Sequence, residues 1–142
     1  MYLNTWIVLQ ALSTTWMTAI IWIVQLLIYP TFLKMHKSEF ADFHNQHSQR
    51  ITWLVGPVMI LELACSVVLL RSELSLSLAI ANFITVLAVF ALTFFVSVPI
   101  HNQLGLGFST AAAQQLVRTN WWRTFVWTLR FVGVLSFLII KS

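Results

Sequence analysis

The first 33 residues carry no charged side chain, and this feature excludes most soluble folds: the first charged residue is Lys34. Such a segment is too long for a cleavable signal peptide, which would also need a basic start. Of all 142 residues, 59% are hydrophobic and only 8% are charged. A soluble domain of this size has too little interior to bury that much apolar surface. The sequence therefore predicts an integral membrane protein whose N-terminal segment spans the bilayer.

Four segments are long and apolar enough to cross a membrane. A hydrocarbon core about 30 Å thick needs about 20 helical residues, because every backbone amide must find its partner within the segment. The predicted spans are 5–29, 51–70, 74–98 and 121–140, with polar interfacial segments at 30–50 and 99–120. A tight turn is expected near Arg71, Ser72 and Glu73. The predicted fold is all-α, a polytopic membrane four-helix bundle that makes residues 1–142 a single transmembrane domain.

The distribution of basic residues predicts an orientation. Arg71 and Lys141 are the two basic residues at one end, whereas five lie in or beside the polar segments. Because lysine and arginine accumulate on the cytoplasmic side, we expect both polar segments inside and both termini outside, in a bacterial inner membrane. Indole rings favour the membrane interface, so four tryptophans should anchor that same side. The five basic residues are Lys34, Lys37, Arg50, Arg118 and Arg123, and the four tryptophans are Trp53, Trp121, Trp122 and Trp127.

The two halves of the chain have a similar layout: a long uncharged segment, a proline, a polar stretch and an aromatic-led helix. The four residues from Arg50 to Trp53 align with the four from Arg118 to Trp121 at an offset of 68, with arginine and tryptophan identical at the two ends. The same offset pairs Glu62 with Arg130. Since each half has an even number of spans, a true repeat would consist of two parallel helical hairpins. A chance match is the alternative.

Glu62 and Arg130 are each the sole charge deep within a predicted span. A charge near the bilayer centre is costly and normally faces the bundle interior with a partner. We therefore expect these two side chains to meet. A structural ion pair and a substrate-facing role are both open interpretations. Arg123, seven residues before Arg130, shares its helix face.

Histidines gather at the predicted cytoplasmic end. Phe40, His44, His47 and Ile51 follow spacings of three and four, which predicts one helical stripe with the histidines on its apolar side. His101 follows the proline that ends the third span. One interpretation is hydrogen-bonded interfacial histidines; the other is a metal or haem site formed by His44, His47 and His101. The catalytic glutamate of a zincin motif is missing, and a lone cysteine offers no thiolate cluster.

Two segments of the second half carry a resemblance to a known family. They are Pro99-Ile100-His101-Asn102-Gln103-Leu104 and the run from Leu116 to Thr124, which includes Asn120-Trp121-Trp122-Arg123. Together with the four-span layout, they resemble the anthrone-oxygenase-like family of small four-helix membrane proteins. That resemblance implies oxidation of a polycyclic phenolic substrate by dioxygen.

The sequence leaves two interpretations of function. The first is a membrane oxidoreductase with a pocket in the cytoplasmic half of the bundle for an amphiphilic aromatic, quinone-like or lipid-like substrate. His44, His47 and His101 would be its catalytic acid–base groups, and the substrate would contact Arg50, Glu62, Arg118, Asn120, Arg123 and Arg130. The second is a non-enzymatic membrane subunit or a lipid- or haem-binding protein.

The expected partners are membrane lipids and a hydrophobic small molecule. A homo-oligomer or a place in a larger membrane complex stays open, as does a haem or transition-metal cofactor. Nucleic acid is excluded, because the eight basic residues are scattered among helix ends without forming a patch.

Overall fold

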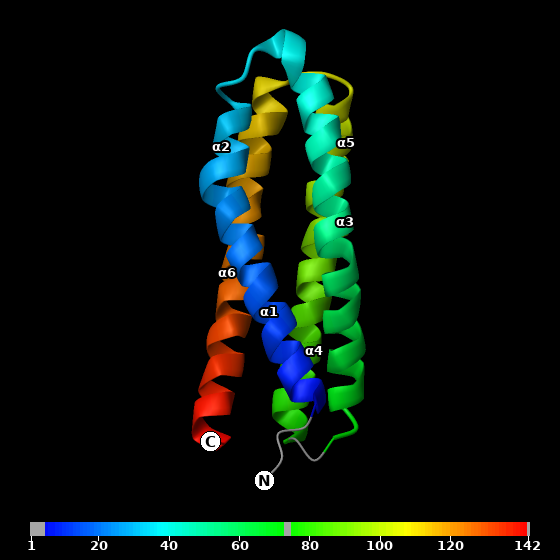
Figure 1. Ribbon diagram of the computed structural model, residues 1–142, viewed down its shortest axis with the longest axis vertical. Helices are drawn as coiled ribbons and strands as arrows, with labels where there is room; N and C mark the ends of the chain where they lie inside the picture. The colour runs from blue at the N-terminus through cyan, green and yellow to red at the C-terminus, as the bar shows by residue number, and fades with distance from the viewer. Residues whose placement is uncertain (1–4, 73–74, 142) are drawn as a thin grey trace.

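The computed structural model describes residues 5–72 and 75–141, which form a bundle of four helical rods (Figure 1). Within these residues there is no strand, so the predicted all-α four-helix bundle is confirmed. Both termini lie at one end of the bundle, and the connections at 33–36 and 106–109 lie at the other (Figure 1). The rods are α1 (Thr5–Ile23), η1 (Val24–Ile28) and α2 (Tyr29–Phe32); α3 (Lys37–Leu69); α4 (Leu76–Ala91), η2 (Leu92–Ser97) and α5 (Val98–Gly105); and α6 (Thr110–Lys141).

All four rods are long and apolar enough to cross a membrane. Large apolar side chains are exposed along them, as in a protein surrounded by lipid: Phe95 is 81% exposed and Trp53 is 77% exposed. The helices also run beyond the predicted spans, because most of the polar segments 30–50 and 99–120 is helical. The turn at Arg71 and Ser72 is present, whereas Glu73 and Leu74 lie outside the described residues.

Two π-helical turns occupy equivalent places in the two halves. η1 is followed by Tyr29-Pro30, and η2 is followed by Val98-Pro99. Proline has no amide hydrogen, and its ring clashes with the carbonyl four residues earlier, so the preceding turn widens. This common feature supports the interpretation of an internal repeat. The wide turns also contain the buried side chains of Gln25 and Ser97. They lie in the half of the bundle opposite the termini, which we call the upper half (Figure 1).

A stripe of buried polar residues runs along α1 toward the bundle axis. Gln10, Thr14 and Thr18 are buried at intervals of four residues. Lipid is as apolar as leucine, so buried polar side chains rather than apolar ones mark the inward face of a membrane helix. Two apolar clusters fill the remaining interior, one around Phe32 and Leu104 and one around Met17 and Trp127. These clusters separate the polar groups of the interior into two levels.

Trp127 differs from the sequence prediction. Trp53 and Trp122 are exposed, as an interfacial position requires, but Trp127 is completely buried in the lower apolar cluster. Its indole N–H donates a hydrogen bond to the carboxylate of Glu62 at 3.1 Å. A buried carboxylate offers the indole a stronger partner than lipid headgroups do, so the predicted interfacial role of Trp127 is wrong.

Candidate functional site

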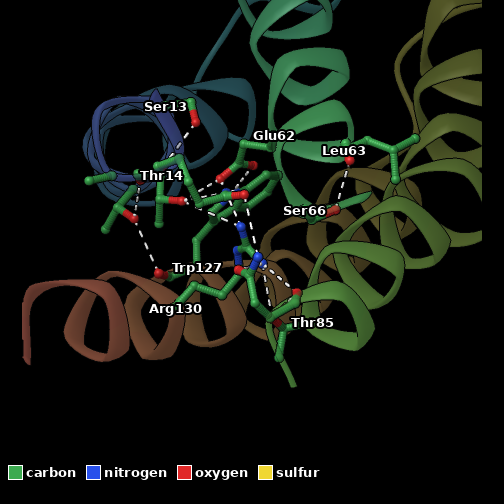
Figure 2. Close-up of polar contacts among 12 residues, drawn as sticks. Ser13, Thr14, Glu62, Leu63, Ser66, Thr85, Trp127 and Arg130 are labelled. Atoms are coloured by element: carbon green, nitrogen blue, oxygen red, sulfur yellow. Dashed lines mark hydrogen bonds and ion pairs between the residues drawn. The ribbon is translucent and has the colours of Figure 1, made fainter. Parts of the chain in front are cut away.

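The lower polar level is a network around Glu62 and Arg130, which we call the deep cluster. Glu62 Oε1 accepts hydrogen bonds from Arg130 Nη2 at 3.1 Å and from Thr14 Oγ1 at 2.7 Å, and Oε2 accepts from Trp127 Nε1 at 3.1 Å. Figure 2 shows Glu62 and Arg130 facing each other between the helices. Both side chains are almost completely buried. The predicted meeting of Glu62 and Arg130 is confirmed.

The deep cluster extends to the third rod. Arg130 Nη1 donates to Thr85 Oγ1 at 2.9 Å and to the backbone oxygen of Asn82 at 3.1 Å. Asn82 Nδ2 donates to Gln10 Oε1 at 3.4 Å. All four rods therefore contribute to one network whose two charges neutralise each other. A buried ion pair is tolerated when hydrogen bonds also satisfy its remaining polar atoms, and such a network fixes helix register.

The upper polar level contains three titratable side chains in series, which we call the histidine chain. Tyr29 Oη lies 3.0 Å from His101 Nε2, and His101 Nδ1 lies 2.9 Å from His44 Nε2. The three residues come from α2, α5 and α3. Phe40 stacks on the His44 ring with centroids 5.5 Å apart, and the Phe32 ring meets the same imidazole edge-on. This aromatic packing shields the His44 end of the chain, where only 1% of His44 is exposed; His101 is partly buried.

The histidine chain is arranged to move a proton. Each of its two contacts needs one donor and one acceptor, so two doubly protonated imidazoles cannot hold the contact between His44 and His101. If Tyr29 donates to His101, then His101 Nδ1–H donates to His44 Nε2; the reverse tautomers reverse both bonds. At the far end, His44 Nδ1 is buried and has no hydrogen-bond partner. The chain therefore ends on a buried nitrogen whose hydrogen-bonding capacity is unused.

Arg123 lies at the other end of the histidine chain. Its Nη1 donates to Ser97 Oγ at 3.3 Å and to Asn120 Oδ1 at 3.2 Å, and the guanidinium lies over the Trp127 ring. The Arg123 charge is within electrostatic reach of the Tyr29 hydroxyl. Arg123 Nε is buried without a hydrogen-bond partner. Arg123 thus lies near the Tyr29 end of the histidine chain, and Arg123 Nε and His44 Nδ1 are both buried nitrogens without a hydrogen-bond partner.

The predicted site residues fall into four groups. His44 and His101 are brought into contact, and Asn120 and Arg123 are buried next to Tyr29 and Gln25. Arg50 and Arg118 are exposed on α3 and α6. His47 is half-buried, and its ring contacts Phe32. Glu62 and Arg130 belong to the deep cluster, about 27 Å from His44 along the axis of α3, so they do not join the histidines in one pocket.

The metal interpretation gains no geometric support. Within residues 5–72 and 75–141, no group of three or more histidine, cysteine or acidic side chains is placed to hold a metal ion. The facing nitrogens of His44 and His101 are bonded to each other. A metal or haem bound through His44, His47 and His101 stays a prediction.

Several residues of the two sites were missed in the sequence. The sequence places Tyr29 only at the end of the first span, before Pro30, and carries no signal that the Tyr29 side chain is buried. Gln10 and Thr14 share one helix face in a span without charges, which marks them as interior. Comparison with family models, curated proteins and solved structures gives no match to this chain.

Proposed function

We propose that this protein is an oxidoreductase of a bacterial inner membrane that removes a proton from a hydroxylated, amphiphilic aromatic or quinol-like substrate. The observation that carries the proposal is the series Arg123, Tyr29, His101 and His44, in which all but the partly buried His101 are buried. Arg123 Nε and His44 Nδ1 have no hydrogen-bond partner. The resemblance to the anthrone-oxygenase-like family supports the same class of reaction. The predicted topology would place the site in the cytoplasmic half of the membrane.

In the proposed step, Arg123 Nε–H binds the substrate oxygen. The substrate O–H bond breaks, and its proton goes to the Tyr29 oxygen while the Tyr29 proton moves to His101 Nε2. The His101 Nδ1 proton then moves to His44 Nε2. Tyr29 is again a neutral phenol, His101 is neutral as its Nε2–H tautomer, and His44 becomes the imidazolium. The negative charge stays on the substrate oxygen, where the guanidinium of Arg123 stabilises it. For a hydroquinone, the resulting anion gives two electrons and its remaining O–H proton to dioxygen, His44 returns the second proton, and the products are the quinone and hydrogen peroxide. Dioxygen is the oxidant that the resemblance implies.

The non-enzymatic alternative has its own supporting observation. Glu62 accepts three hydrogen bonds, and the network around it links all four rods. Such a network serves packing and register without any ligand. In this alternative the histidine chain is a second structural network, and the protein acts as a membrane subunit or lipid-binding protein.

Oxygen uptake by the purified full-length chain in detergent tests the proposal. The probes are an anthrone and a short-chain hydroquinone, each supplied with dissolved dioxygen. Wild-type protein should consume oxygen, and Tyr29→Phe should lower the rate about 10²-fold or more, because loss of a positioned acid–base group costs about 10²- to 10⁴-fold. His44→Gln should have a similar effect. His36→Gln is the matched control, since His36 is exposed at the start of α3.

Two outcomes would contradict the proposal. One is unchanged turnover in a folded Tyr29→Phe variant. The other is the absence of oxygen uptake by wild-type protein with both probes. An optical spectrum and metal analysis of the same preparation test the haem and metal prediction directly.

A further inference from the structure

A cavity of about 290 Å³ lies beside the deep cluster, toward the end of the bundle where both termini lie. Its walls are mainly apolar and include Leu78, Leu129 and Phe137. Leu78 and Leu129 are 52% and 54% exposed, so this wall reaches the lipid-facing surface of α4 and α6. A molecule dissolved in the bilayer can therefore enter from the side.

The floor of this cavity is polar and includes Gln10, Asn82 and Arg130. Arg130 Nε is buried and has no hydrogen-bond partner, although Nη1 and Nη2 of the same guanidinium are fully engaged. An unsatisfied buried donor is costly, and the hydrocarbon of a membrane offers no water to satisfy it. An acceptor on a molecule bound in the cavity would satisfy this donor.

The charges next to the polar floor of the cavity restrict which headgroup a ligand can have. Glu62 already neutralises Arg130 at 3.1 Å. An anionic headgroup would add an uncompensated negative charge to a buried site, and a cationic one would add an uncompensated positive charge. A neutral group with an exposed oxygen, such as an ester or ketone carbonyl, satisfies Arg130 Nε without either cost.

We propose that this cavity binds a neutral amphiphile, with its carbonyl oxygen accepting a hydrogen bond from Arg130 Nε and its hydrocarbon chain lying against the apolar wall. The site is separate from the histidine chain, and the inference stands whether or not the protein is an oxidoreductase. Two sources share this chemistry: an ester-linked bilayer lipid and a membrane quinone.

Photolabelling of the full-length chain in phosphatidylcholine nanodiscs tests the inference. The probes are a monoacylglycerol and a benzoquinone, each with a diazirine in an alkyl tail of equal length, and the matching diazirine fatty acid as an anionic control. A Cβ atom built at Gly133, which lines the cavity, meets no atom within 4 Å. The side chain of Gly133→Leu therefore starts in open space, and we expect it to occupy part of the cavity.

Ala81→Leu fills the same cavity from α4 and keeps the test valid if Gly133→Leu does not fold. Ala91→Leu is the matched control, because Ala91 is exposed on α4 away from the cavity lining. A neutral probe should label peptides of α4 and α6 that line the cavity. Labelling should fall about 10-fold in the cavity-filling variants, the change that corresponds to a tenfold weaker affinity. It should be unchanged in Ala91→Leu.

Competition between the two neutral probes identifies the source, since the tighter ligand displaces the other. The inference is overturned if neither neutral probe labels the lining peptides above the rest of the lipid-facing surface. It is also overturned if folded Gly133→Leu and Ala81→Leu proteins label as wild type does, or if the fatty acid labels the cavity better than the monoacylglycerol.

Discussion

Replacing Glu62 by glutamine should destabilise the protein by more than the loss of its hydrogen bonds. Glu62 accepts from three donors at its two oxygens: Thr14, Trp127 and Arg130. A glutamine side chain has only one acceptor oxygen. Its NH2 group would therefore face one of these three donors, and no hydrogen bond can form between two donors. Hydrogen bonds within membranes average about 0.6 kcal/mol each and reach about 1.7 kcal/mol. The lost hydrogen bonds alone would therefore cost about 1–2 kcal/mol.

The larger cost comes from Arg130, whose buried positive charge loses its carboxylate partner in this substitution. The side chain of Arg130 is only 1% exposed and has no second carboxylate among its described partners. Breaking a buried ion pair by removing one partner costs about 3–5 kcal/mol. The double change Glu62→Gln with Arg130→Met removes both charges and should therefore be less destabilising than Glu62→Gln alone. The resulting coupling free energy should be about 2–3 kcal/mol.

Equilibrium unfolding in mixed micelles, titrated with a denaturing detergent, measures the free energy of unfolding for all four members of this cycle. Arg118→Met provides the control, because Arg118 is exposed on the same helix. Its effect should add to that of Glu62→Gln within error. If the effects of Glu62→Gln and Arg130→Met were also additive, the reasoning from a buried, mutually dependent charge pair would be refuted.

Two further predictions follow from the same contacts and from the charge distribution. Asn120→Leu should lower the free energy of unfolding by about 1–3 kcal/mol, because it removes a partner from both Gln25 and Arg123. Thr119→Ala, whose hydroxyl bonds only within its own helix, should have a smaller effect in the same detergent titration. Reporter fusions at Ser142 should report a location outside the cytoplasm, in line with the excess of basic residues in or beside the polar segments 30–50 and 99–120. A fusion that is active only in the cytoplasm would reverse the topology.

If the two halves are a true repeat, as their similar layout predicts, the repeat gives the ion pair a structural context. Glu62 and Arg130 occupy corresponding positions at an offset of 68, and they contact each other directly. In a pair of parallel repeats, equivalent residues that face the bundle axis approach one another. One half then supplies the anion and the other the cation, so the two halves are joined by complementary charges.

Sequence alone determined the number of helices and one long-range contact. Helix number follows from the length of apolar segments, because a bilayer of fixed thickness demands a span of fixed length. The contact of Glu62 with Arg130 could be predicted because each is the sole charge deep in its span, and an unpaired charge there is costly. Helical periodicity also placed His44 on an inward face.

Tertiary structure decided which of the remaining polar residues meet. Tyr29, His44 and His101 are far apart in the sequence, and nothing in it indicates that they form one hydrogen-bonded chain in the order Tyr29, His101, His44. It also did not distinguish the buried indole of Trp127 from the exposed one of Trp122. The physical reason is that lipid and protein interior are equally apolar, so hydrophobicity does not fix the rotation of a membrane helix about its axis. That rotation is set by interhelical packing and hydrogen bonds, which exist only once all four helices are together.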